Sequence, residues 1–319
     1  MADHRGAEAT GGARGIRHPG RAGGTRVPSG GGFVSPRMSV VIPAHDEASV
    51  IGRLLHGLVA DPRSAELEIV VVANGCTDGT VSVARSFEPA VGVVVIAEAS
   101  KIAALEAGDA EVTTFPRAYV DADVSVDVPA LLALADALTR RDGPLVASPR
   151  LEVDTADASW PVRQHYRIWE LSDYRVAGHI GSGVYAMSAE GRARFGSWPR
   201  VIADDRFVQQ LFPPSERETL AGHAFTVRSA RTVSAHVRRS TRIARGNLEL
   251  PAELQLATEE PARARAASLA RRVARRPDLW VAFAVYCVTA TVPKLLARRQ
   301  MADRREPEWA RDETSRAIA

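Results

Sequence analysis

The stretch "SVVIPAHDEASVIGRLLHGLV" (residues 39–59) decides the fold class, because it joins a short apolar run to a helical pattern. Residues 40–42 are β-branched and the run ends at Pro43, which is typical of a buried strand. Apolar side chains then recur with helical spacing from Val50 to Val59. The stretch therefore predicts a strand followed by a helix, the repeating unit of an α/β protein.

The same alternation continues along the chain. Further apolar runs predict strands over 67–73, 91–97 and 117–124, and helical patterns lie between and after them, over 80–87, 101–108 and 129–141. Strands that alternate with helices predict an α/β fold with a mainly parallel, right-handed wound sheet and helices on both of its faces.

The pattern is less regular after residue 145. Strands are expected over 145–153 and 181–188 and one or two more over 224–237, with helices over 159–177 and 204–212. The glycine- and arginine-rich residues 1–37 hold few large apolar side chains, so we expect this segment to be disordered. The expected organisation is a disordered segment over 1–37, a sheet domain over 38–250 and a helical extension over 251–319.

An apolar run within the extension allows two interpretations. Residues 279–292 form a run of about 14 residues, which is shorter than the roughly 20 needed to cross a bilayer, and Pro293 and Lys294 end it. The run is either a helix packed on the domain or a membrane-surface helix flanked by arginines, with peripheral contact through 279–299.

Composition excludes several classes of protein. The 41 basic and 38 acidic residues give a net charge of +3, which argues against a nucleic-acid binder. Cys76 and Cys287 lie far apart and form no disulfide framework. No apolar signal region is found near the N-terminus, so we expect a cytoplasmic protein, either free or peripheral at the inner face of the membrane.

Acidic side chains follow the predicted strands at the edge where wound sheets bind their ligands. Asp121 and Asp123 are the sharpest case, because residues two apart on an extended segment point the same way. Two such carboxylates repel each other unless a cation lies between them. Mg²⁺ and Mn²⁺ prefer oxygen ligands and often bind substrate phosphates as well. The pair predicts a site for Mg²⁺ or Mn²⁺ that receives a diphosphate; the alternatives are a solvated acidic turn or a helix cap before Val128 and Pro129.

A second acidic pair, Asp204 and Asp205, precedes an amphipathic pattern. One of these residues could simply cap a helix. The functional interpretation makes Asp205 a general base that deprotonates an acceptor hydroxyl, with Asp204 in a supporting role.

Several basic residues are weaker candidates. Lys101 opens a predicted helix, where it could contact phosphate or be an ordinary surface lysine. Arg242 and Arg245 could clamp a diphosphate, or they could belong to a solvated face. His236 is placed at the end of a late strand, as a core or surface histidine or as an added metal ligand.

Six pieces of sequence, in order, resemble the family 2 glycosyltransferases from about Ser39 to about Leu250. These are "VVIPAHDE" (40–47), "VVVANGCTDGT" (70–80), "SKIAALEAG" (100–108), "YVDADV" (119–124), "GSGVY" (181–185) and "ADDRFV" (203–208). No single piece is specific, but their order is. The resemblance implies a GT-A fold, a nucleotide-diphospho-sugar donor and, usually, inversion at the anomeric carbon.

The resemblance also implies roles for particular residues. Pro43, Ala44 and Glu47 would border the nucleoside pocket, Asn74 and Asp78 would face the base and ribose, and Asp121 and Asp123 would form the DxD motif, with Asp123 the direct metal ligand. Asp205 would match the catalytic base, His236 a third metal ligand, and Arg242 and Arg245 a basic motif near the diphosphate.

Two departures from the family pattern and two rival classes remain. Ala73 stands where many members have an aspartate, and the "QxxRW" signature of processive synthases is absent, which favours a single transfer. A nucleotidyltransferase would need a glycine-rich basic loop after the first strand, but "PAHDEAS" (43–49) is acidic. A non-catalytic nucleotide-sugar-binding or scaffold protein would bind the donor without turnover. The sequence thus predicts a metal-dependent glycosyltransferase with a glycan, lipid or small-molecule acceptor.

Overall fold

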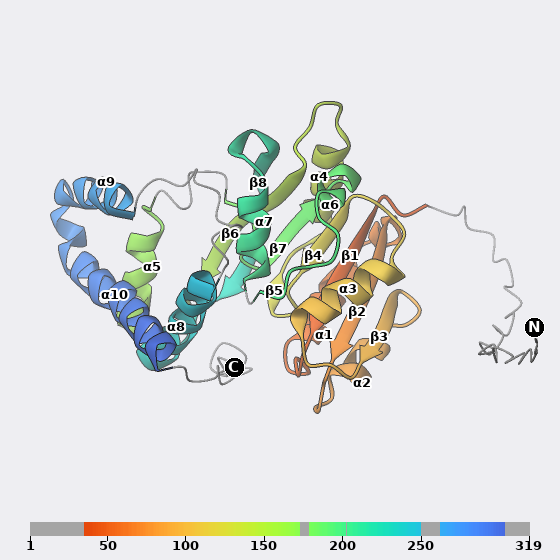
Figure 1. Ribbon diagram of the computed structural model, residues 1–319, viewed down its shortest axis with the longest axis horizontal. Coiled ribbons are helices and arrows are strands. Elements are labelled where there is room, and N and C mark those ends of the chain that lie inside the picture. The colour runs from red at the N-terminus through yellow and green to blue at the C-terminus, as the bar shows by residue number, and fades with distance from the viewer. Residues whose placement is uncertain (1–34, 173–178, 202, 250–261, 304–319) are drawn as a thin grey trace, which may run out of the picture. The chain divides into compact units, whose positions relative to one another are not determined.

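The computed structural model describes residues 35–172, 179–201, 203–249 and 262–303. In this part of the chain the strands form one sheet in the order β3-β2-β1-β4-β7-β6-β8-β5 (Figure 1). The strands are β1 (Met38–Ala44), β2 (Leu67–Asn74), β3 (Val91–Ile96), β4 (Arg117–Val120), β5 (Val124–Ser125), β6 (Val146–Asp154), β7 (Val184–Met187) and β8 (Arg217–Arg228).

The sheet is mainly parallel, as the alternation of strands and helices predicts. β1 lies between β2 and β4, and both neighbours run parallel to it, with Ala44 opposite Ala73 and Val41 opposite Tyr119. β7 is antiparallel to its neighbours β4 and β6, whereas β6 is parallel to β8. The carboxyl ends of β1, β2, β3 and β4 therefore meet at one edge of the sheet.

Helices cover both faces because side chains alternate along each strand. Val40 and Ile42 pack into a core with α1 (Ile51–Val59), α2 (Thr80–Arg85) and α4 (Val128–Thr139). Val41 points the other way and packs with α3 (Lys101–Glu111) and α7 (Asp204–Leu211). The short helix α6 (Ala189–Ala193) follows β7. The predicted α/β fold with helices on both faces is confirmed.

The C-terminal helices form a further packed group. α10 (Trp280–Ala302) lies along α5 (Trp160–Trp169) and α8 (Val233–Glu249), and α9 (Ala262–Ala274) precedes it (Figure 1). A small core joins α5, α9 and α10 through Ile168, Leu269, Val273, Leu279 and Ala282. The expected helical extension is therefore present over 262–302, while 250–261 and 304–319 lie outside the described residues.

Two predicted strands differ from the structure. The strand expected over 117–124 ends at Val120, because Val124 leaves β4 and pairs with Val227 of β8. The strand expected over 224–237 ends at Arg228, and Val233 begins helix α8 instead. Thr232 Oγ1 accepts a hydrogen bond from the N–H of Ala235 at 3.2 Å, which is the arrangement of a helix cap.

Two other expectations concern the ends of segments. The helix expected over 159–177 has its α-helical part at Trp160–Trp169, and residues 173–178 lie outside the described part of the chain. The disorder expected over 1–37 falls mostly on residues 1–34, which also lie outside it, and stays a prediction. Arg37 belongs to the fold, because its N–H donates to the carbonyl of Glu66 at 2.7 Å.

Candidate active site

The loops that follow β1 and β2 are tied together by hydrogen bonds. Asn74 Nδ2 donates to the carbonyl of Ala44 at 2.9 Å, and His45 Nδ1 lies 2.6 Å from the carbonyl oxygen of Asn74. The N–H of Ala48 donates to Asp78 at 3.1 Å. The structure thus brings together the ends of β1 and β2 and the loops that follow them, which carry the expected nucleoside-binding residues Pro43, Ala44, Glu47, Asn74 and Asp78. Their role in binding stays a prediction.

Asp46 holds these two loops in a strained arrangement. Its φ of 49° lies in the left-handed region, which side-chain-bearing residues rarely adopt. Its carboxylate accepts hydrogen bonds from the N–H of Thr77 at 2.5 Å and from the N–H of Asp78 at 3.2 Å. The sequence pattern assigned Asp46 no role in the site. Its partners Thr77 and Asp78 are 31 and 32 residues away, so no local signal reveals the bridge.

A group of possible ligands that sequence reasoning missed lies in the same loops. His45, Asp46 and Cys76 each offer one ligand atom, and these atoms lie within 4.8 Å of one another. It is the one group of three or more such side chains found among the described residues. Burial raises the pKa of the Cys76 thiol, which therefore stays protonated at neutral pH in the absence of a cation.

Lys101 joins two acidic segments that lie far apart in the sequence. It is the first residue of α3, whose N-cap Ser100 accepts from the N–H of Ala103. Its Nζ lies 2.8 Å from Asp121 Oδ1 and 2.8 Å from Asp204 Oδ1. The side chain of Asp204 is 3% exposed, whereas those of Lys101 and Asp121 keep 32% and 37%. The lysine therefore bridges the two predicted acidic pairs at the carboxyl edge of the sheet.

The second acidic pair divides its bonds between core and loop. Asp204 Oδ2 accepts from the hydroxyl of Tyr185 at 2.9 Å, which fixes Asp204 against β7. Asp205 Oδ2 accepts from the N–H of Ser182 at 3.0 Å, and its Oδ1 from the N–H of Arg206 at 2.7 Å. Asp204 is thus fixed by the core and by Lys101, while Asp205 is aimed by the backbone of a loop.

That loop, residues 181–183, passes between the two acidic pairs. All three of its residues have positive φ, at 105°, 61° and 118°. A Cβ on Gly181 would lie 2.6 Å from Cβ of Asp205, and one on Gly183 would lie 2.8 Å from Cγ1 of Val124 and 3.6 Å from Asp121 Oδ2. Glycine is therefore required at both positions, for backbone conformation and for space. The carbonyl of Gly183 also accepts from the N–H of Asp121 at 2.8 Å.

The electrostatics follow from one lysine among several carboxylates. Burial raises the pKa of Asp121 to about 6; Lys101 opposes this shift, and Asp204 and Asp123 add to it. Burial also raises the pKa of Asp205, as does the neighbouring Asp204. For Lys101, burial lowers the pKa, but the two adjacent carboxylates more than reverse this and raise it overall. The lysine is a permanent cation, and Asp121 and Asp205 take up protons more readily than exposed aspartates.

The turn that holds Asp121 and Asp123 differs from the expected extended segment. It bends immediately after β4, so the argument that two residues on a strand share a face does not apply. Asp121 pairs with Lys101, whereas Asp123 lies near Arg53. Burial lowers the pKa of the Arg53 guanidinium, and the charge of Asp123 partly opposes this shift. Two carboxylates on one turn still fit a cation that prefers oxygen ligands, and the single lysine leaves the group with surplus negative charge.

His236 is placed in helix α8 rather than at the end of a strand, which corrects the expectation. It is 2% exposed, its ring lies 4.3 Å from that of His165 on α5, and Tyr166 also contacts it. The ligand atoms of His236, Asp121 and Asp123 do not come within 4.8 Å of one another in the described part of the chain. A metal-binding role for His236 stays a prediction that this arrangement does not support.

Arg242 and Arg245 also lie on α8, three residues apart as the sequence requires. Arg245 Nε donates to Glu249 at 2.6 Å, one helical turn further on. Arg242 is exposed. Whether the two guanidinium groups bind a diphosphate stays a prediction.

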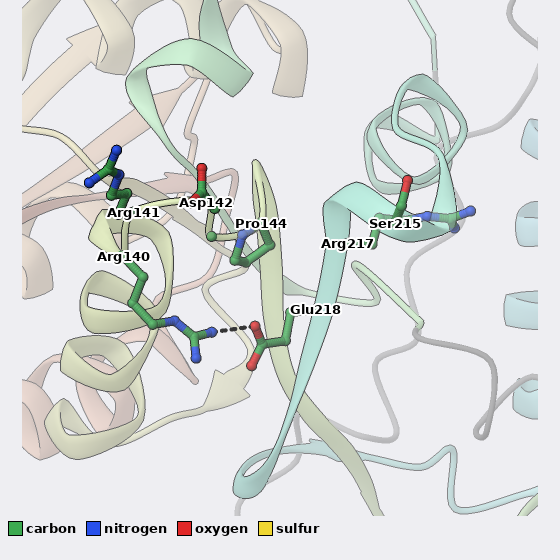
Figure 2. Close-up of a pocket in the computed structure, with 8 residues that line it drawn as sticks. Arg140, Arg141, Asp142, Pro144, Ser215, Arg217 and Glu218 are labelled. Atoms are coloured by element: carbon green, nitrogen blue, oxygen red, sulfur yellow. Dashed lines mark hydrogen bonds and ion pairs between the residues drawn. The ribbon is translucent and has the colours of Figure 1, made fainter.

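Figure 2 shows a pocket at the edge of the sheet opposite to the carboxyl ends of β1 to β4. It is lined by Arg140–Pro144, which precede β6, and by Ser215, Arg217 and Glu218 at the start of β8, and Arg140 forms an ion pair with Glu218 across it. Val146 at the start of β6 and Arg117 at the start of β4 both pair with Met187. The pocket therefore lies at the amino ends of the parallel strands, away from Lys101 and its carboxylates.

The fold and the acidic site together define a class of protein. A wound α/β sheet that gathers acidic side chains at the carboxyl ends of its strands is the arrangement of a GT-A glycosyltransferase. Residues 39–192 match the model of the family described as Glycosyl transferase family 2. Residues 39–192 of the chain therefore form a glycosyltransferase family 2 domain, and the protein is a glycosyltransferase.

Several solved structures are similar to this chain. The mannosyltransferase PcManGT from Pyrobaculum calidifontis, solved with GDP-Man and Mn²⁺, is 22% identical; 85% of this chain and 79% of that one are covered, with a TM-score of 0.52. S. aureus TarS 1–349 is 14% identical, with 82% and 91% covered and a TM-score of 0.46. Glucosyl-3-phosphoglycerate synthase from Mycobacterium tuberculosis is 17% identical, with 60% and 70% covered and a TM-score of 0.44. No curated protein sequence matches the chain significantly.

Proposed function

We propose that the enzyme transfers one sugar from a nucleotide-diphospho-sugar to an acceptor hydroxyl, with inversion and with the help of Mg²⁺ or Mn²⁺. The observation that carries the proposal is the Lys101 bridge between Asp121 and Asp204, because it puts the acidic turn and the second acidic pair into one site. Asp205 follows directly on Asp204 and is aimed by the loop at Ser182. The archaeal mannosyltransferase of similar fold was solved with a nucleotide sugar and Mn²⁺, which is consistent with this assignment.

Asp121 and Asp123 would hold the divalent cation. When bound, the cation would neutralise charge on the leaving diphosphate. The pKa of Asp121, raised to about 6, leaves this carboxyl largely ionised at neutral pH and so available as a ligand. Lys101 would add a fixed positive charge beside the same phosphates. We assign Mg²⁺ and Mn²⁺ equally, because both prefer carboxylate oxygens.

Asp205 would act as the general base. It accepts the proton of the acceptor hydroxyl as that oxygen forms its bond to the anomeric carbon, and the bond from that carbon to the nucleoside diphosphate breaks on the opposite face. The raised pKa of Asp205 makes it a better proton acceptor than an exposed aspartate. Asp204 positions the pair through Tyr185 and Lys101.

A single transfer is proposed because the sequence lacks the "QxxRW" signature of processive synthases. The acceptor is a glycan, a lipid or a small molecule with a free hydroxyl. The cytoplasmic location expected from the sequence remains part of this proposal.

The test separates chemistry from binding. UDP-, GDP- and dTDP-sugars are screened by thermal shift with and without Mn²⁺, since a ligand of the native state raises Tm. The donor found in this way is then used to measure donor hydrolysis. Asp205→Asn is expected to lower turnover by about 10²- to 10⁴-fold, the usual contribution of a general base, while the Mn²⁺-dependent thermal shift is retained.

The matched control is Asp142→Asn, in the pocket at the far edge of the sheet, which should leave both measurements unchanged. Full turnover in Asp205→Asn would remove this residue from the mechanism. If no donor raises Tm, either with or without Mn²⁺, the assignment of the site is overturned.

A further inference from the structure

Helix α10 presents an apolar stripe to the solvent. Trp280, Val281, Val288 and Leu295 are between 51% and 65% exposed, and Ala284 and Cys287 lie exposed among them. Their spacing of three, four and seven residues places them along one side of the helix. Pro277–Ala302 is also long and apolar enough to cross a membrane by length and composition. A stripe of this size on the surface calls for a partner.

The opposite side of α10 is committed to the protein. Ala282, Thr289, Pro293 and Ala297 are buried there, and the helix packs along α5 and α8. Thr289 Oγ1 lies 2.8 Å from Nδ1 of His165, so a buried hydrogen bond fixes α10 to α5. A lone helix that spans a bilayer would be surrounded by lipid. Here one side is covered by protein, which leaves only the outer stripe for contact.

Basic residues lie at both ends of the stripe. Residues 262–303 hold eight arginines, one lysine and two aspartates, so this segment is strongly basic although the whole chain carries only +3. Arg275 and Arg276 precede the stripe, and Lys294, Arg298 and Arg299 lie at its far end; all five are exposed. The partner must therefore combine apolar material with negative charge, as the surface of an anionic bilayer does.

We propose that α10 binds the surface of an anionic membrane, with the stripe from Trp280 to Leu295 inserted at the level of the lipid headgroups and the flanking arginines on lipid phosphates. The stripe extends for about 22 Å at 1.5 Å per residue, which is shorter than the roughly 30 Å hydrocarbon core. It therefore fits a helix that lies in the interface better than one that crosses it. This inference goes beyond the proposed sugar transfer and does not depend on it.

The experiment measures co-sedimentation of the full chain with vesicles, in the absence of nucleotide. Vesicles of phosphatidylcholine with one third phosphatidylglycerol are compared with pure phosphatidylcholine. We expect binding to the anionic vesicles and weaker binding to the neutral ones, with release from the anionic vesicles at high salt. The double variant Val281→Glu/Val288→Glu should weaken binding by roughly tenfold or more, since it places two charges on the inserted side.

The matched control is Val95→Glu on β3, which adds a charge at a comparably exposed valine outside α10. It should bind vesicles like the natural sequence. All of the substituted side chains are exposed, so Tm should change little in either variant. Trp280 provides a second readout, because brominated lipids should quench part of the tryptophan fluorescence and Trp280→Phe should abolish that part.

Four results would overturn the proposal. The first is that the chain stays in the supernatant with anionic vesicles, and the second is that the double variant binds as well as the natural chain. The third is that only detergent releases the chain from vesicles, which would indicate a membrane span. The fourth is that the chain is a dimer and the double variant is a monomer, which would indicate that a second copy covers the stripe. If the full chain does not bind vesicles but a chain truncated after residue 303 does, the stripe is covered by the chain's own C-terminal segment and not by a membrane. Because no nucleotide is present, none of these results bears on donor binding.

Discussion

Helix α3 carries a charged residue near each end, and the two belong to clusters that differ in charge balance. Near the end of the helix, Asp109 accepts hydrogen bonds from four side chains: Arg117 at 2.5 Å, Tyr119 at 2.7 Å, Arg192 at 2.8 Å and Trp198 at 2.8 Å. At its start, Lys101 is shared between Asp121 and Asp204, with Asp205 adjacent. The first cluster has donors in excess of acceptors, and the second has the reverse.

The difference separates a stabilising cluster from the one that we propose to be catalytic. Burial would raise the pKa of Asp109, but the hydrogen bonds from Trp198, Tyr119 and the two arginines lower it overall. In the Lys101 cluster the pKa values of Asp121 and Asp205 are raised instead. A carboxylate that is fully satisfied stabilises the fold. Carboxylates that outnumber their donors attract a metal ion or a proton, which is what catalysis requires.

The largest effect is expected on stability, from Asp109→Asn. The change leaves Arg117 and Arg192 buried without their shared anion, and breaking a buried ion pair costs about 3 kcal/mol. The free energy of unfolding, measured in urea, should fall by about that amount. The lowered pKa fixes the pH dependence: this stabilisation is present at neutral pH and is lost as pH falls through the folded-state pKa, below the ordinary aspartate value of about 3.9.

Asp136→Asn is the control for that measurement. Asp136 pairs with Arg37 and its side chain is 66% exposed, so its loss should cost well under about 1 kcal/mol. Equal effects of the two substitutions would contradict the stabilising role of the Asp109 cluster. So would an Asp109→Asn variant with unchanged stability.

The next effect is expected on turnover, from Gly181→Ala. The new Cβ would lie 2.6 Å from Cβ of Asp205, on a backbone with φ of 105°, so Asp205, the proposed base, must move. A displacement of this size should lower turnover by roughly tenfold to a hundredfold. Gly222→Ala has open space around it and should show no change. If both variants turn over donor equally, the loop does not position Asp205.

A smaller effect is expected on pH dependence, from Lys101→Met. The lysine opposes the upward pKa shifts of Asp121 and Asp205, so its removal should raise both values further. Mn²⁺ binding requires deprotonated carboxylates. Its midpoint, expected near pH 6 in the natural chain, should move up by about one unit when binding is titrated across pH.

Lys294→Met, which removes the other lysine of the chain, should leave that midpoint in place. A midpoint that stays unchanged in Lys101→Met would show that the lysine does not control the acidic turn. In that case the difference in charge balance between the two clusters would have no effect on metal binding.

Much of the fold could be predicted because local pattern and tertiary structure agree. The apolar run that ends at Pro43 and the helical spacing after it are confirmed as β1 and α1. Asp121 was expected at the carboxyl end of a parallel strand, where the ends of neighbouring strands meet, and the structure places it just after β4. Asp204 and Asp205 were expected before a helix, and they begin α7, where Lys101 joins Asp204 to Asp121.

The errors arose where long-range pairing overrides local pattern. Val124 looks like the continuation of β4, but it pairs with Val227, a partner that no local pattern reveals. Residues after 232 read as a strand, although Thr232 is a capping residue whose hydrogen bond to Ala235 begins a helix. That cap was a usable signal. The role of Lys101 was foreseen only as a phosphate contact, because the approach of Asp204 depends on how α7 packs.

The pairing of β5 with β8 makes completion of the site a late event in synthesis. The turn at 121–123 lies between β4 and β5, and β5 is held by its pairing with β8, which ends only at Arg228. Asp204 and Asp205 also come after residues 39–192, the segment that matches the family. A nascent chain that has emerged only to residue 192 therefore carries the loops that follow β1 and β2. It lacks the second acidic pair and β8, the strand that holds the turn at 121–123. A recombined protein that inherits 39–192 alone would inherit an incomplete site.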